Sequence, residues 1–212
     1  YLSSDGINWQ GPFNQGYVGV QRSSYANEVL LFPITGTNVL CYSYDGVYTW
    51  DHTTLPHSAT NNHSNVIWVP NYNKFYMFYE YSGQEYCCTS ADGLTWSSSL
   101  SGSSFYSRRS LSFIGSRIVS VVTGSTTGHP LVSTDGSTWT SYYMPYHTTG
   151  LANDGSYFVS PVTEQGIIWS QDGISWTFVP ISGLTHPTDA VFNGSYFTCL
   201  NVGVSGSFSF IF

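Results

Sequence analysis

The side chains of this 212-residue chain that could do chemistry are few: five lysines and arginines, 12 aspartates and glutamates, and six histidines. Several of them stand beside tyrosines. Tyrosine rings next to histidines, arginines and carboxylates suit a sugar, whose apolar ring face stacks while its hydroxyl groups bond, or a polar protein epitope. The predicted ligand-binding residues are Tyr143, Tyr146, His147, Arg108, Arg109, Glu164, His186 and Asp189.

Catalysis and metal binding have weaker signals in the sequence. A zinc site needs converging ligands, and no His-x-His, His-x-x-x-His or Cys-x-x-Cys spacing occurs. A glycoside hydrolase needs two carboxyl groups that flank the scissile bond. Carboxylates that could serve are Glu80, Glu85, Glu164, Asp51 and Asp189, and no motif joins them. We therefore predict no catalytic residue, no metal and no cofactor, and an enzyme remains the alternative.

The elements that position these residues follow from a repeat. Five times the chain has a serine, any residue, Asp-Gly, and a tryptophan four or five residues after the aspartate. The repeated aspartates are Asp5, Asp45, Asp92, Asp135 and Asp172. Their spacing of 37 to 47 residues, with turn signals and short runs of β-forming residues in each copy, is typical of a β-propeller.

Each repeat is predicted to form a four-stranded antiparallel blade. The Asp-Gly pair predicts a two-residue hairpin in which both residues have positive φ, with cross-strand bonds between pairs such as Ser90 and Thr95. The copy at Asp45 has one residue more before its tryptophan, so a bulged or three-residue form is expected there. The repeated aspartates are expected to be structural, since their side chains can bond the turn backbone.

The ends of the chain indicate a closed ring. The last repeat and the first residues together give a gap that falls within the range of the others. We predict an all-β, five-bladed β-propeller, one domain over residues 1–212, closed by the N-terminal strand. Both Tyr1–Ser4 and Phe208–Phe212 align with a third strand of the closing blade, so one of them must do something else.

A four-stranded meander separates the turns into two ends. The first and third turns of every blade, with the Asp-Gly pairs, Lys74 and Arg117, share what we call the Asp-Gly end. The second turns and the connections between blades share the opposite end. All six histidines are predicted at this histidine end: His52, His57, His63, His129, His147 and His186. Titratable residues on loops of a rigid scaffold favour this end as the binding face.

Composition excludes some partners. The net charge of −7 argues against nucleic acid and anionic membranes, and no apolar run approaches 18 residues. The chain lacks an initiator methionine and a signal peptide and begins inside a repeat, so we expect a segment of a longer protein. Cys41 and Cys88 precede their repeat aspartates by four residues, a position that is otherwise apolar, which predicts buried free thiols.

The repeat resembles the Asp-box (BNR) repeat of sialidases and related propellers, Ser-x-Asp-x-Gly-x-x-Trp, with the residue between aspartate and glycine missing. The resemblance covers the whole chain and implies that the repeated turns are structural and lie away from the ligand. The Phe-Arg-Ile-Pro motif of sialidases is absent.

In its low charge and many aromatic residues, the chain also resembles receptor-binding tips of bacteriophage tail fibres and spikes, and five-bladed lectins. That implies a non-catalytic head on a virion surface or in the extracellular space, with a cell-surface glycan or receptor protein as its partner. The alternatives are a glycoside hydrolase or sialidase-like enzyme and a protein-binding scaffold.

Overall fold

The structure, a computed structural model, is built from short antiparallel strands. It describes residue 8 and residues 23–34, 36–45, 48–58, 63–104, 108–122, 129–163, 165–182, 184, 186–202 and 208–211. At 103–104, 108–109, 201–202 and 208–211 this description covers the backbone only. The helical content of these ranges is one 3-10 turn, η1 (Pro70–Tyr72), and none of their helices is long and apolar enough to cross a membrane.

The strands form four sheets of four strands and one of three. The first sheet holds β1 (Ser24–Ala26), β2 (Val29–Pro33), β3 (Val39–Ser43) and β4 (Asp51–Thr54). The second holds β5 (Ile67–Val69), β6 (Lys74–Tyr81), β7 (Gln84–Ser90) and β8 (Ser97–Ser104). The third holds β9 (Arg108–Ile114), β10 (Arg117–Val122), β11 (Leu131–Ser133) and β12 (Thr140–Ser141).

The fourth sheet holds β13 (Ala152–Asn153), β14 (Phe158–Val162), β15 (Gly166–Ser170) and β16 (Thr177–Pro180). The fifth holds β17 (Pro187–Phe192), β18 (Phe197–Val202) and β19 (Phe208–Ile211). Neighbouring strands are consecutive in the chain, so every sheet is a meander, as predicted. Of the two segments that aligned with the third strand of this sheet, residues 208–211 form it, as β19 paired with β18. Tyr1–Ser4 and the predicted closing strand lie outside the described residues, as does Asp5.

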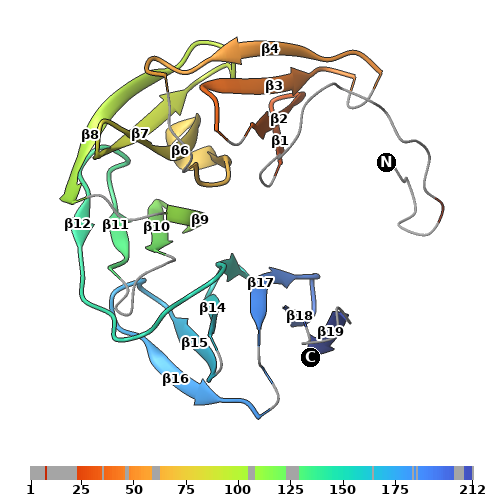
Figure 1. Cartoon of the computed structure of the whole chain (residues 1–212), viewed down its shortest axis with the longest axis vertical. Coiled ribbons are helices and arrows are strands. Elements are labelled where there is room, and N and C mark those ends of the chain that lie inside the picture. Colours follow the sequence, from red (N-terminus) through yellow and green to blue (C-terminus); the bar gives the residue numbers. More distant parts are fainter. Residues whose placement is uncertain are drawn as a thin grey trace.

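The sheets follow one another around a common centre (Figure 1). First strands such as β9 and β17 lie toward the centre, and the last strands β4, β8, β12 and β16 lie on the outside. Successive sheets pack face to face, and four apolar clusters of the described residues each join two neighbouring sheets. One cluster contains Leu31 of the first sheet and Phe75 of the second, and another contains Val119 of the third and Phe158 of the fourth. The predicted all-β, propeller-like arrangement is thus confirmed.

Strand β6 of the second sheet is buried on both faces. Residues 75–79 of β6 are each at most 2% exposed, so an uninterrupted apolar run replaces the usual alternation. The thiols of Cys41, Cys87, Cys88 and Cys199 are free and buried. This confirms the prediction for Cys41 and Cys88, and burial raises the pKa of Cys87 to about 12.

Side chains join neighbouring sheets near the centre. The Asn65 amide donates to the carbonyl of Leu111 and accepts from the Leu111 amide (3.1 and 2.6 Å), as a strand backbone would. The Leu151 amide donates to the Ser110 hydroxyl at 2.9 Å. These bonds satisfy backbone groups that the innermost strands leave without a ladder partner.

The Asp-Gly loops differ from the predicted hairpins. Seven residues, 90–96, connect the paired residues Thr89 and Ser97, and the third and fourth sheets have loops of the same length. Gly93 has a φ of 77°, whereas Asp92 is not among the residues with positive φ. The prediction of positive φ at both residues is therefore wrong.

The loop is closed by the bonds of its own residues. The Ser90 hydroxyl donates to the Asp92 carboxylate (2.8 Å) and accepts from the Gly93 amide (2.8 Å), so the predicted Ser–Thr pairing is replaced. The same Asp92 carboxylate accepts the amides of Leu94 and Thr95 at 2.8 and 2.7 Å. Loops at Asp135 and Asp172 repeat this pattern. These aspartates, with Asp45, serve the turn, as predicted.

The repeated glycine has a second role, because it touches the preceding sheet. A Cβ at Gly136 would lie 2.3 Å from the Tyr76 hydroxyl oxygen, and one at Gly173 would lie 2.3 Å from Cγ2 of Val119. Both distances are shorter than any real Cβ contact. A glycine is required there by positive φ and by close packing together.

Candidate functional site

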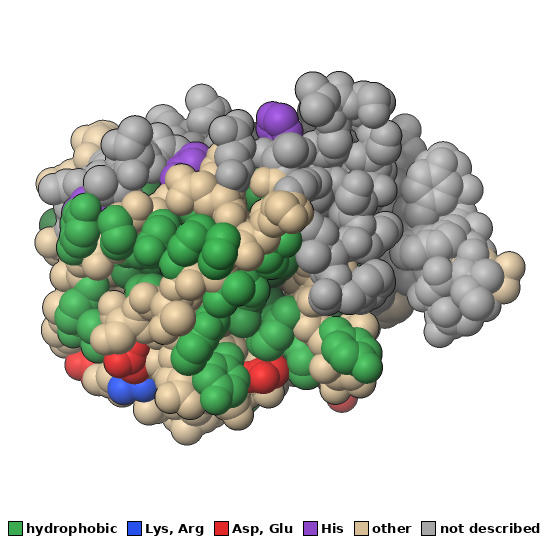
Figure 2. All heavy atoms as spheres, turned by 90° about the horizontal axis from the view of Figure 1, so that it is seen from below, with side chains coloured by type: hydrophobic (Ala, Val, Ile, Leu, Met, Phe, Trp, Pro, Cys, Tyr) green, Lys and Arg blue, Asp and Glu red, His purple; other side chains and the backbone are tan. Residues whose placement is uncertain are grey.

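The two ends of the molecule differ in charge. Figure 2 shows histidines along the upper edge of one face, and acidic and basic side chains along the lower edge. Five of the six histidines lie on the connections that define the histidine end. His52 is the exception: it lies within β4, on the outermost strand, and its side chain is 57% exposed. Its prediction as a loop residue is wrong, because β4 begins directly after Trp50.

The predicted aromatic residues of the histidine end have different environments. Tyr143 is 66% exposed, and its ring meets His129 edge-on at 6.1 Å. Tyr146 is half-buried and stacks on Phe178 of β16, with ring centroids 5.1 Å apart and planes 15° apart. Tyr146 also belongs to the apolar cluster around Met144, so it contributes to packing as well as to the surface.

The predicted polar residues are spread over three sheets. The His147 ring lies 3.0 Å from the Thr163 hydroxyl, and its carbonyl accepts the Thr163 amide, so His147 braces the turn after β14. His186 is exposed beside β17, and the half-buried Asp189 of β17 accepts the amide of Ala190. Arg108 and Arg109 begin β9, and Glu164 lies outside the described residues. Their role in binding stays a prediction.

An aromatic cluster at the histidine end was only partly visible in the sequence. His57 Nδ1 lies 2.6 Å from the Tyr79 hydroxyl oxygen, and the His57 ring stacks on Tyr81 at 4.6 Å and approaches Tyr86 at 4.7 Å. Burial raises the pKa of Tyr79 to about 12, so its phenol keeps a proton to donate. The sequence Tyr79-Glu80-Tyr81 is conspicuous, but nothing in it points to His57. The cluster anchors the chain after β4 to the β6–β7 hairpin.

His63 is buried between the first two sheets. It is 2% exposed, and burial lowers its pKa to about 4 although a bond to the Thr37 backbone acts in the opposite sense. Its Nδ1 has no hydrogen-bond partner among the described residues. His63 is therefore neutral at pH 7. Keeping it neutral costs more folding free energy as the pH falls, because the unfolded chain can take up the proton.

The exposed aromatic surface lies mainly at the Asp-Gly end. Six of the nine large, exposed apolar side chains of the described residues are tyrosines, and Tyr143 alone among the six is at the histidine end. The other five flank first or third turns of a sheet: Tyr25, Tyr44, Tyr48, Tyr157 and Tyr196. Tyrosines beside the turn residues are the signal for this surface in the sequence. The predicted binding face was based on titratable residues and so did not include them.

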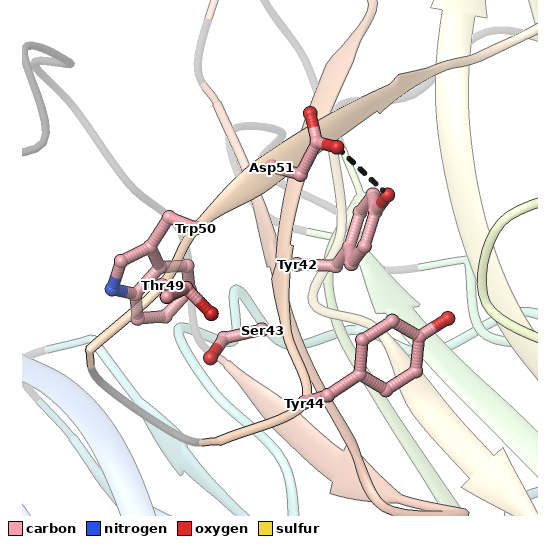
Figure 3. A pocket seen from close by; sticks show the side chains of 6 residues that line it. All are labelled: Tyr42, Ser43, Tyr44, Thr49, Trp50 and Asp51. Atoms are coloured by element: carbon pink, nitrogen blue, oxygen red, sulfur yellow. Dashed lines mark hydrogen bonds between the residues drawn. The ribbon is translucent and has the colours of Figure 1, made fainter.

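A pocket of about 310 Å³ lies along the β3–β4 hairpin, at this end (Figure 3). Its lining residues are Tyr42, Ser43, Tyr44, Thr49, Trp50 and Asp51. The side chains of Tyr42, Tyr44 and Asp51 lie on one side of the hairpin, and those of Ser43, Thr49 and Trp50 on the other.

The Tyr42 hydroxyl donates to Asp51 Oδ2 at 3.2 Å. Partial burial and the Asp51 charge raise the pKa of Tyr42. The rings of Tyr42 and Tyr44 meet at 73° with centroids 5.6 Å apart. The pocket therefore offers aromatic faces and an oriented carboxylate.

Among the described residues, no three histidine, cysteine, aspartate or glutamate side chains lie close enough together to hold a metal ion. The arrangement that these ranges do offer is one of aromatic faces, hydroxyl groups and separate carboxylates. Such groups bind by stacking and hydrogen bonding.

Comparison with known proteins gives the fold. No protein-family model matches the sequence, and no curated protein does. Among solved structures, a GH74 enzyme of Niastella koreensis is 17% identical with a TM-score of 0.62, over 99% of this chain and 32% of that one. YCF48 bound to D1 peptide is 16% identical with a TM-score of 0.63, over 91% and 62%. The virginiamycin B lyase of Staphylococcus aureus, in complex with quinupristin, is 8% identical with a TM-score of 0.69, over 94% and 71%.

The chain thus spans about a third of the length of the GH74 enzyme and about three fifths of the length of YCF48. At such low identity the likeness concerns the path of the backbone alone. Together with the antiparallel sheets arranged around a common centre in Figure 1, it shows that this chain has a β-propeller fold.

Proposed function

We propose that the chain is a non-catalytic binding module that recognises a cell-surface glycan or receptor protein. The observation that carries this proposal is the set of six exposed tyrosines on turns of a rigid scaffold. Tyrosine gives a large contact area at little cost in conformational entropy and adds a hydroxyl group for bonding. The hydrogen-bonded aspartates of the repeated loops also favour binding over catalysis, because their carboxylates are engaged by the turn.

The proposed architecture is a closed ring of five blades, in which the N-terminal strand completes the last blade. Support comes from the five sheets of the described residues and from the fifth sheet, in which β19 is the edge strand among those residues. A crystal structure in which the termini enter different blades would contradict this closure.

The proposed setting is the tip of a viral, bacteriophage-type fibre or spike, with the domain forming part of a longer extracellular or virion protein. The Asp-box relationship fits the recurring bonds of the Ser-x-Asp-Gly loops. The net charge of −7 fits a surface that does not bind nucleic acid, and the lack of a long apolar run fits a domain that does not insert into membranes. Similar propellers include YCF48, solved with a D1 peptide, and a nidogen–laminin complex, so this fold is used for protein contacts elsewhere.

A glycoside hydrolase is the second candidate. Glu80 and Glu85 stand opposite each other in the register of β6 and β7, and the GH74 neighbour is an enzyme. Glu85 is only 2% exposed and accepts the Ser101 hydroxyl at 2.9 Å. Paired carboxylates with different burial are what acid–base catalysis on a sugar uses.

A glycan array probed with the 212-residue chain tests the proposal, followed by calorimetry on each hit. Binding without release of reducing sugar is the expected result. Tyr143→Ala and His186→Ala then test the histidine end, where a contact residue should lower affinity about 5- to 150-fold. Absence of binding to glycans and to host-cell surface proteins would refute the module. Turnover of a hit that Glu85→Gln abolishes would establish the enzyme instead.

A further inference from the structure

The β3–β4 loop departs from the other Asp-Gly loops. Eight residues, 43–50, separate the pair Tyr42–Asp51, where the other sheets have seven. The Asp45 carboxylate accepts the amides of Tyr48 and Thr49, three and four residues on, and the Thr49 hydroxyl at 2.7 Å. In the other loops the donors are two and three residues on. The extra residue is therefore accommodated without loss of the turn bonds.

The hairpin also differs in chemistry at the pair that closes it. The equivalent pairs are Thr89–Ser97, Val132–Thr140 and Trp169–Thr177. Tyr42–Asp51 alone among these four places a carboxylate on the outer strand, and the position after the repeat serine holds Tyr44. A structural turn does not need either residue, because the other three loops form without them.

The Asp51 carboxylate is held in place yet accessible. Oδ1 accepts the His52 amide at 2.8 Å and Oδ2 accepts the Tyr42 hydroxyl at 3.2 Å, while the side chain is 69% exposed. A carboxylate has about four acceptor sites, of which these two hydrogen bonds use two, and His52 Nδ1 lies 3.6 Å from Oδ1, beyond hydrogen-bond distance. Tyr44, 58% exposed, lies beyond Tyr42 on the same side of the hairpin, with its ring at 73° to that of Tyr42. A fixed acceptor and an exposed ring on the same side of the hairpin are therefore available to a ligand.

We propose that this hairpin is a monosaccharide subsite, in which the Asp51 carboxylate accepts two neighbouring hydroxyl groups of a neutral hexose and the Tyr44 ring stacks on its apolar face. The inference rests on the proposed glycan-binding function and moves one contact site to the Asp-Gly end. The volume of about 310 Å³ is at the small end for ligand pockets, as one sugar ring requires. Sugar hydroxyl groups donate to carboxylates and C–H faces stack on aromatic rings, which matches the groups present.

The test uses methyl glycosides of glucose, galactose, mannose and N-acetylglucosamine, titrated against the 212-residue chain whose tyrosine rings are isotopically labelled. For one of these sugars, NMR signals of Tyr42 and Tyr44 should shift in a saturable manner. Asp51→Asn and Tyr44→Ala should weaken binding at least about 5-fold, the lower range for a contact residue. Thr140→Ala, the equivalent position of the third sheet, should leave it unchanged. Melting temperatures confirm that the variants fold.

Three results would overturn the subsite. If the sugar binds and Asp51→Asn and Tyr44→Ala bind as well as the parent, while Tyr143→Ala does not, the glycan-binding function stands and the subsite is wrong. If no glycoside and no array glycan bind, both are wrong. A third result is that a lysine or arginine peptide binds in place of sugar, and that salt at about 0.5 M abolishes this binding because it screens the attraction between charges. The pocket then recognises a cationic protein partner.

Discussion

Replacing Gly136 by alanine tests how tightly one sheet rests on the next. Gly136 has a φ of 71°, and an added Cβ would lie 2.3 Å from Tyr76 Oη and 3.0 Å from Cδ2 of Tyr72. Both tyrosines belong to the second sheet and the turn before β6, whereas Gly136 belongs to the third. The substitution therefore strains the backbone and forces two sheets apart at once.

The two costs can be separated with a matched control. Gly115 also has positive φ, 58°, but a Cβ there would meet nothing within 4 Å. Gly115→Ala should cost only the left-handed conformation, about 1–2 kcal/mol. Gly136→Ala adds overpacking against Tyr76, about 1–3 kcal/mol more. In a chain of this size each kcal/mol lowers the melting temperature by about 2–4 °C.

Thermal unfolding followed by circular dichroism, with calorimetry as a check, measures the difference. Tyr76→Phe removes the oxygen that the new methyl group would strike, so the double variant Gly136→Ala/Tyr76→Phe should recover part of the loss. Positive coupling in this double-mutant cycle is the expected outcome. Equal destabilisation by the two alanine variants, or no recovery with phenylalanine, would refute the close approach of the loop to the second sheet.

The other predictions concern acid stability and packing. The pKa of His63 is about 4 in the folded protein and 6.5 in the unfolded chain, so the stability due to neutral His63 is complete above pH 6.5 and is lost as pH falls toward 4. His63→Gln should therefore reduce the dependence of the melting temperature on pH in that window. Although burial raises the pKa of Asp92, the amides of Thr95 and Leu94 lower it to about 2, so its contribution is present above pH 3.8 and is lost as pH falls to about 2. Asp92→Asn should therefore weaken the acid dependence of urea unfolding below pH 4. Tyr146→Ala should destabilise the fold by about 1–3 kcal/mol through the lost Phe178 contact, whereas exposed Tyr143→Ala should change the unfolding free energy by less than about 0.5 kcal/mol.

The fold could be predicted from the sequence because the repeat is long-range and redundant. The spacing of the Asp-Gly pairs is enough to place the third turn of the first four sheets, and short runs of β-forming residues place the strands around it. The turn geometry could not be predicted in the same way. Ser90 and Asp92 bond with the loop rather than across the ladder, and those side-chain-to-backbone bonds make a seven-residue loop where two turn residues were expected.

The sequence predicts better at which end of the molecule a side chain lies than how exposed that side chain is. The connections of a meander determine that His57 and His147 lie at the histidine end, but His57 is packed among tyrosines and His147 braces a neighbouring turn. Tyr146 looked like a surface aromatic and instead stacks on β16. Exposure depends on which face of a neighbouring sheet a ring meets, and the repeat carries no information on that.

Departures from the repeat are where function has room to act. Within a loop the serine, aspartate and glycine are fixed by hydrogen bonds and by contact with the preceding sheet, so they can change little without loss of stability. The position between the serine and the aspartate carries no such constraint, and it differs in every copy. In the first sheet this position holds the exposed Tyr44, and the same hairpin has an extra residue, the exposed Tyr48 and the oriented carboxylate of Asp51. Because packing does not require that combination, its presence is better explained by a ligand than by the fold.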